Sequence, residues 1–180
     1  MNPRPLLVTP FFVVGALAFT TPPAQAGLML GLDVGPNFVL NAPDSGEQDL
    51  DLDQDAGIGI AARLGYQLDL KILKLIPEAK FGFEDPGAPD AFRIMGGLRV
   101  RLLEGFSPVA FAHLGGLVGD LEGFAWDVGG GIDFTLIPHL ALGAFVSYNR
   151  AENRPLNLDN FEGPDAWEWL QVGAAVTFTL

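Results

Sequence analysis

The sequence AWEWLQVGAAVTFTL, at residues 166–180, places an apolar residue at every second position from Leu170 onward. The residues between them are small or polar. Successive side chains of a β-strand point to opposite faces, so this segment is predicted to be a strand with one wholly apolar face. In a membrane barrel such a strand pairs with the first strand, which leaves no sheet edge open.

The same alternation recurs in seven earlier segments and predicts an all-β chain. The predicted strands span residues 27–40, 57–69, 73–84, 92–102, 108–119, 124–136, 139–148 and 166–180. In 57–69, for example, Ile58, Ile60 and Leu64 alternate with glycine, alanine and Arg63. The segment 108–119 carries apolar residues at both parities, so its facing stays open.

The connections between these strands differ in length in a regular way. Tight turns are expected near residues 69–71, 103–107 and 137–139, and the intervening connections are longer in three of four cases. Short turns at one end and longer loops at the other are typical of outer-membrane barrels, with both termini at the short-turn end. The predicted fold is therefore an eight-stranded antiparallel up-and-down transmembrane β-barrel.

Residues 1–26 have the features of a cleaved secretory signal peptide. Arg4 precedes an apolar core, and Ala24-Gln25-Ala26 matches an A-x-A cleavage site. A transmembrane anchor is the alternative, but Pro10 and the short apolar run disfavour it. We therefore expect an exported protein whose barrel domain spans residues 27–180.

Composition excludes several function classes. The chain has no cysteine, which excludes disulfides, thiolate catalysis and cysteine-based zinc sites. Its net charge of −12 argues against a nucleic-acid partner, which requires a cationic surface. No stretch after the signal peptide approaches the ~20 apolar residues that a membrane-spanning helix needs.

The polar face of the strands indicates which side lies inside. A soluble barrel would face water with lysine, glutamate and threonine, whereas this face is rich in glycine and alanine with sparse charges. Small residues suit the crowded interior of a narrow barrel, and the unbroken apolar face suits lipid. The sequence thus favours a membrane barrel over a soluble one.

Charged residues on the interior face need partners, because an unpaired buried charge is costly. Five basic and five acidic residues have this parity and form the predicted lumen charge network: Asp33, Arg63, Glu78, Lys80, Glu84, Arg93, Arg99, Arg101, Asp127 and Asp133. Glu78 and Lys80 are expected to reach Arg99 and Arg101 on the neighbouring strand. We predict a salt-bridged plug, with a gated proton or ion path along the same charges as the alternative.

Three local motifs resemble the small eight-stranded outer-membrane barrels of the OmpA/OmpX type. They are PEAKFG at 77–82, GGLRVR at 96–101, and a terminal polar-x-Gly-x-x-hydrophobic-x-aromatic pattern. The terminal pattern comprises Gln171, Gly173, Val176, Phe178 and Leu180. It is similar to the assembly signal of such barrels but ends on leucine instead of phenylalanine or tryptophan. The resemblance covers residues 27–180. It implies a bacterial outer-membrane location, lipid contact, a monomer, and periplasmic chaperones and the barrel-assembly machinery as partners during biogenesis.

The predicted loops hold most of the acidic residues. Asp49, Asp51, Asp53 and Asp55 lie in the first loop at a spacing similar to the start of a calcium site. The match is poor, because Ala56 and Ala62 stand where that site needs glycine and a bidentate glutamate. Solvated loop charges are the preferred interpretation, weak divalent binding is the alternative, and no cofactor is expected.

Some barrels of this size are lipid A deacylases, a family with a histidine two residues before its serine on a late strand. Here Phe145 stands two residues before Ser147, and the two histidines, His113 and His139, lie elsewhere. We therefore expect no enzyme. The sequence predicts an integral outer-membrane barrel with a plugged lumen, acidic external loops and a structural or surface-interaction role. A small channel or transporter and, less favoured, a lipid-modifying enzyme are the alternatives.

Overall fold

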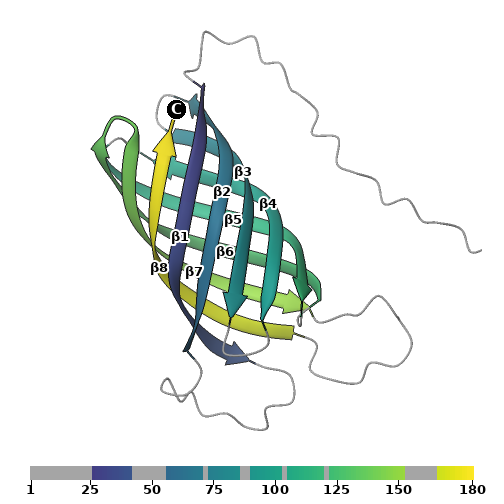
Figure 1. The fold of residues 1–180 in the computed structure, drawn as a ribbon. Coiled ribbons are helices and arrows are strands. Elements are labelled where there is room, and N and C mark those ends of the chain that lie inside the picture. Colours follow the sequence, from purple (N-terminus) through teal and green to yellow (C-terminus); the bar gives the residue numbers. More distant parts are fainter. Residues whose placement is uncertain are drawn as a thin grey trace, which may run out of the picture.

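The computed structural model describes residues 26–41, 56–70, 73–85, 90–102, 105–119, 122–152 and 166–180. They form strands β1 Ala26–Asn41, β2 Ala56–Leu70, β3 Leu73–Asp85, β4 Ala91–Leu102, β5 Phe106–Gly119, β6 Gly123–Ile137, β7 Leu140–Glu152 and β8 Ala166–Thr179. Each strand pairs antiparallel with the next, and β8 pairs with β1, which closes the barrel seen in Figure 1. The predicted eight-stranded antiparallel barrel is confirmed.

Closure runs along most of β1. Met29 lies opposite Thr179 at one end of the seam and Asn41 lies opposite Glu168 at the other, with one irregularity between Val39 and Asn41. Every strand has two neighbours as a result, so no strand edge is left unpaired. Among the described residues, no helix is long and apolar enough to cross a membrane.

The two ends of the barrel differ. The strands β2, β4, β6 and β8 finish at one end of the barrel, which we call the terminal end. The strands β1, β3, β5 and β7 finish at the opposite end, which we call the loop end. At the terminal end Gly105 adopts a φ of +82°, a left-handed conformation that other residues avoid, and its carbonyl accepts a hydrogen bond from the Thr135 amide at 3.0 Å.

The barrel is apolar outside and polar inside. Along β2, Ile58, Ile60 and Leu64 are 44–47% exposed, whereas Ala61 and Arg63 between them are 2% exposed. This reverses the arrangement of a soluble protein, in which charged residues are almost never fully buried. Aromatic pairs lie on the exterior near both ends: Phe83–Phe92 and Trp126–Tyr148 toward the loop end, Phe106–Phe134 toward the terminal end. Aromatic residues at these levels are typical of membrane–water interfaces.

The facing of β5, which its sequence left open, is fixed by the barrel. Val109, Phe111 and His113 are buried in the interior, whereas Leu114 and Val118 are 55% and 60% exposed on the outside. The interior of this barrel therefore accepts apolar as well as charged side chains, and for that reason the alternation of β5 was ambiguous.

Candidate functional site: an ion-pair network in the lumen

All ten residues of the lumen charge network lie inside the barrel, and none is more than 6% exposed. Alternation explains their common facing, because each occupies the interior parity of its strand. Five are basic and five acidic, so their formal charges cancel.

A histidine that the sequence did not assign to this group lies at the centre of the network. The His113 Nε2 atom is 2.8 Å from Glu78 Oε1, and its Nδ1 atom is 2.6 Å from Asp127 Oδ1. The ring thus bridges β3 and β6 from β5 with no side-chain exposure. Carboxylate oxygens accept hydrogen bonds, so each contact needs a proton on the ring nitrogen or on the carboxyl group.

Cations surround both carboxylates. Glu78 receives Arg99 Nε at 3.0 Å and Arg63 Nη1 at 3.3 Å, and the same Arg63 guanidinium lies 2.9 Å from Asp33. On the other side of the ring, Lys80 Nζ lies 3.1 Å from Asp127 Oδ2 and Arg93 Nη1 lies 3.5 Å from it. Hydrogen bonds between ionised groups are stronger than those between neutral groups, so these contacts hold Glu78 and Asp127 firmly in place.

Arg93 extends the network toward the loop end. It forms an ion pair with Glu84 and donates to Asn149 Oδ1 at 2.7 Å and to Gln171 Oε1 at 3.4 Å. Glu84 in turn accepts a hydrogen bond from Asn37 Nδ2 at 2.8 Å. Arg101 and Asp133 form a separate pair at 2.6 Å, nearer the terminal end.

The connected part of the network draws on every strand of the barrel. In strand order its members include Asp33, Arg63, Glu78, Arg93, His113, Asp127, Asn149 and Gln171. Contacts that cross the lumen therefore add to the backbone ladders that join neighbouring strands. Each buried ion costs several kcal/mol to desolvate, and each of the ten charged side chains here has at least one ion-pair partner.

The predicted contacts from β3 to β4 are present only in part. Glu78 contacts Arg99, as expected, but Lys80 crosses the lumen to Asp127 and Arg101 pairs with Asp133. The sequence also missed His113, although β5 places it directly opposite Asp127. A correct β5–β6 register would therefore have predicted that His113 lies beside Asp127.

Glycines make room for the long cations. A Cβ atom on Gly31 would lie 2.7 Å from the Arg63 Cζ atom, and one on Gly97 would overlap the His113 ring. Phe111 adds an aromatic face, with its ring centroid 4.8 Å from the Arg99 guanidinium carbon. Small residues at the interior parity thus provide the space that the arginines fill.

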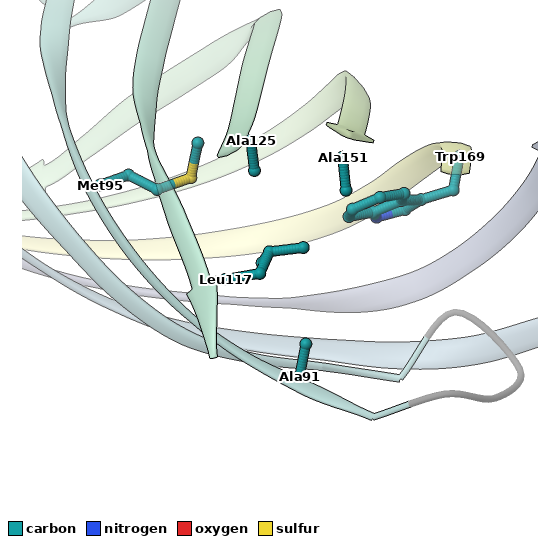
Figure 2. Close-up of a cluster of buried hydrophobic side chains, with 6 residues drawn as sticks. All are labelled: Ala91, Met95, Leu117, Ala125, Ala151 and Trp169. Carbon is teal, nitrogen blue, oxygen red and sulfur yellow. The ribbon is translucent and has the colours of Figure 1, made fainter. Parts of the chain in front are cut away.

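An apolar layer lies toward the loop end, beside the loop-end charges: on β4, Arg93 lies between its members Ala91 and Met95. It consists of the buried residues Ala91, Met95, Leu117, Ala125, Ala151 and Trp169, with Trp167 packed against it. Figure 2 shows these side chains reaching inward from the ribbons around them. Trp169 is 1% exposed, and its indole Nε1 atom makes no hydrogen bond with the described residues. We call this group the apolar layer.

The predicted assembly signal lies along β8. Gln171 points inward and contacts Arg93, whereas Val176 and Phe178 are exposed on the outside. Gly173 lies at the interior parity beside Phe145, and the Leu180 amide donates to the Leu28 carbonyl at 2.8 Å. That the barrel-assembly machinery recognises these residues stays a prediction.

Other predicted features lie apart from the network. Ser147 accepts a hydrogen bond from Asn149 at 3.1 Å, and His139 donates to the Thr179 carbonyl at the terminal end, so the deacylase residues do not meet. Within the described ranges, no three side chains gather to hold a metal ion. The candidate loop Asp49, Asp51, Asp53 and Asp55 lies outside the described residues, as does the predicted signal peptide apart from Ala26, the first residue of β1.

Among the comparisons with known proteins, the likeness to one solved structure supports the fold. No protein-family model and no curated protein matches the sequence. The crystal structure of Neisserial surface protein A (NspA) matches 86% of this chain and 99% of its own length, with a TM-score of 0.54 at 14% identity. Ail of Yersinia pestis matches 86% of this chain and 99% of its own with a TM-score of 0.43 at 13% identity, and the outer membrane protein AlkL matches with 0.42 at 11%. The likeness to NspA confirms the predicted resemblance to small outer-membrane barrels at the level of the fold.

The surface of the molecule indicates its surroundings. The exterior is an apolar band of strands 12 to 16 residues long, and a span of the bilayer core needs about 9–11 tilted residues. A closed barrel satisfies every backbone group within the sheet, as hydrocarbon requires. Closure and the apolar exterior together place these strands across a membrane.

Proposed function

We propose that this membrane-spanning β-barrel belongs to the outer membrane, that its ion-pair network seals the lumen, and that the protein is a non-enzymatic structural barrel. The observation that carries this is the set of contacts joining residues of all eight strands across the interior. An open pore needs a continuous polar path lined by hydrated groups. Here the charged groups are at most 6% exposed and contact one another.

The network and the apolar layer support the same conclusion in different ways. An ion crossing the network would have to separate pairs such as Lys80–Asp127, whose atoms lie 3.1 Å apart. It would then meet the apolar layer around Trp169, whose indole N–H is a donor and cannot replace the hydration shell of a cation. Eight-stranded barrels also have an interior just wide enough for side chains to fill.

The proposed role is to stiffen the envelope and to present acidic loops to the outside. Much of the net charge of −12 comes from residues in 42–55 and 151–168. We propose outer-membrane lipid as the surrounding partner, and periplasmic chaperones and the barrel-assembly machinery as partners during biogenesis. A monomer is expected, because closure leaves no strand edge for another subunit.

Single-channel recording in planar bilayers tests the seal. The chain is refolded in detergent, its folded state is verified by the shift of its band on heating, and current is recorded after insertion. We expect no steady openings. The variant Trp169→Ala/Met95→Ala, which thins the apolar layer and leaves the ion pairs in place, is expected to stay closed as well. Steady openings of the unaltered protein would make it a small channel and overturn the proposal. Openings of the variant alone would assign the seal to the apolar layer instead of the network.

A further inference from the structure

A cavity of about 350 Å³ lies at the terminal end of the barrel. Six polar or charged residues line it: Gln67, Lys74, Arg101, Thr135, His139 and Thr179. They come from β2, β3, β4, β6, β8 and the β6–β7 turn, so the cavity is the mouth of the lumen at this end. Its size is within the range of small-molecule sites.

The charges that line the cavity are positive. Lys74 and Arg101 each carry a full charge, and none of the described residues lining the cavity is acidic. Asp69 and Asp133 reach the two cations without lining the cavity, at 3.9 Å from Lys74 and 2.6 Å from Arg101. The described carboxylates that pair with these two cations are therefore not among the residues that line the cavity.

Arg101 Nε, a buried donor of a residue only 6% exposed, makes no hydrogen bond with the described residues. Gln67 Oε1, the other such atom at the cavity, is an acceptor and needs a donor such as a water molecule or a protonated ligand oxygen. Buried polar groups in folded proteins normally have partners. A guanidinium offers five donors and no acceptor, so the missing partner of Arg101 is an acceptor such as a ligand oxygen.

His139, Thr135 and Thr179 complete the polar lining of the cavity. The Nδ1 atom of His139 lies 2.9 Å from the Thr179 carbonyl oxygen, which can only accept, so Nδ1 carries the hydrogen; in the neutral ring Nε2 is then an acceptor, suited to a protonated oxygen of a ligand. Two threonine hydroxyls supply adaptable donors and acceptors. We propose that this cavity binds a small oxyanion, a carboxylate or a phosphate, from the compartment that the terminal end faces. The proposal holds whether or not the lumen above is sealed.

Isothermal titration calorimetry tests the site. Inorganic phosphate and acetate are titrated in separate arms into the chain refolded in uncharged detergent, at constant chloride concentration. We expect saturable binding at one site per barrel for at least one anion. Lys74→Met keeps the aliphatic stem and removes the charge, and is expected to weaken binding by about tenfold or more, the effect of losing one charge-assisted hydrogen bond.

Arg150→Met is the matched control. Arg150 is also partly exposed and paired with a carboxylate, but it lies on the outside toward the loop end, so its removal is expected to leave the affinity unchanged. Should Lys74→Met lack the heat-shifted folded band, Thr135→Val replaces it. Absence of saturable heat with both anions would overturn the proposal. So would equal affinity in the cavity variant and the unaltered protein, or equal weakening by Arg150→Met, which would mark charge attraction without a site.

Discussion

Asp127 is the carboxylate whose removal tests the network most directly. It is the one carboxylate within ion-pair distance of Lys80 among the described residues, and it also contacts His113 and Arg93. Asp127→Asn keeps the shape and removes the charge. Arg93 would retain Glu84 and His113 would retain Glu78, but Lys80 would become an uncompensated buried cation. We expect the free energy of unfolding to fall by about 3–5 kcal/mol, the cost of breaking a buried ion pair from one side.

The second half of this double-mutant cycle removes Lys80, the cation that Asp127→Asn leaves without a partner. Lys80→Met alone leaves Asp127 with two partners and is expected to cost about 1–3 kcal/mol. In the double variant Asp127→Asn/Lys80→Met no unpaired charge remains at this point. Its loss of stability is therefore expected to be smaller than the sum of the single losses by about 2 kcal/mol.

Equilibrium urea unfolding in phospholipid vesicles, followed by tryptophan fluorescence, measures these free energies. Glu168→Gln is the control, because its ion pair with Arg150 is 22–36% exposed and is expected to contribute less than about 1 kcal/mol. Additive single losses, or an Asp127→Asn variant as stable as the control, would refute the reasoning. Either result would mean that water, not the partner side chains, solvates the lumen charges.

Two further substitutions, with Gly96→Ala as a control, probe how closely the interior side chains are packed. Gly31→Ala is expected to lower the free energy of unfolding by about 1–3 kcal/mol, because the new Cβ would lie 2.7 Å from the Arg63 guanidinium carbon. Gly96→Ala has open space around the new Cβ and is expected to change the free energy of unfolding by less than about 1 kcal/mol. The same urea titrations compare the two variants. Trp169→Ala is expected to cost about 3–5 kcal/mol by emptying the apolar layer, and a loss below about 1 kcal/mol would show that this layer is not packed.

Alternation along the chain predicted the strands and the facing of most of them, because lipid demands an apolar residue at every exterior position. It failed for β5, where Phe111 and Leu117 are apolar and buried inside. A membrane barrel can place apolar side chains on both of its faces, so polarity alone did not separate them. The ten lumen charges were found because a charge at a lipid-facing position in the middle of such a strand is costly.

The partners of those charges were harder to predict. Lys80 was expected to reach the adjacent strand, yet its carboxylate comes from β6 across the lumen. Contacts through the interior depend on the curvature of the closed sheet, which no sequence pattern encodes. The part played by His113 was missed for the same reason, since it follows from two strands that approach it from different sides.

Every strand contributes a residue to the lumen network, and this affects the order in which the barrel can assemble. Arg93 and Gln171 are 78 residues apart, and Arg63 and Thr177 are 114 apart, so these contacts form only when the last strand arrives. Until then Arg93 lacks Gln171 and Arg63 lacks Thr177, and an unclosed sheet would expose incompletely partnered charges to hydrocarbon, which is costly. We therefore expect the bilayer to favour the closed barrel over a sheet that still lacks β8.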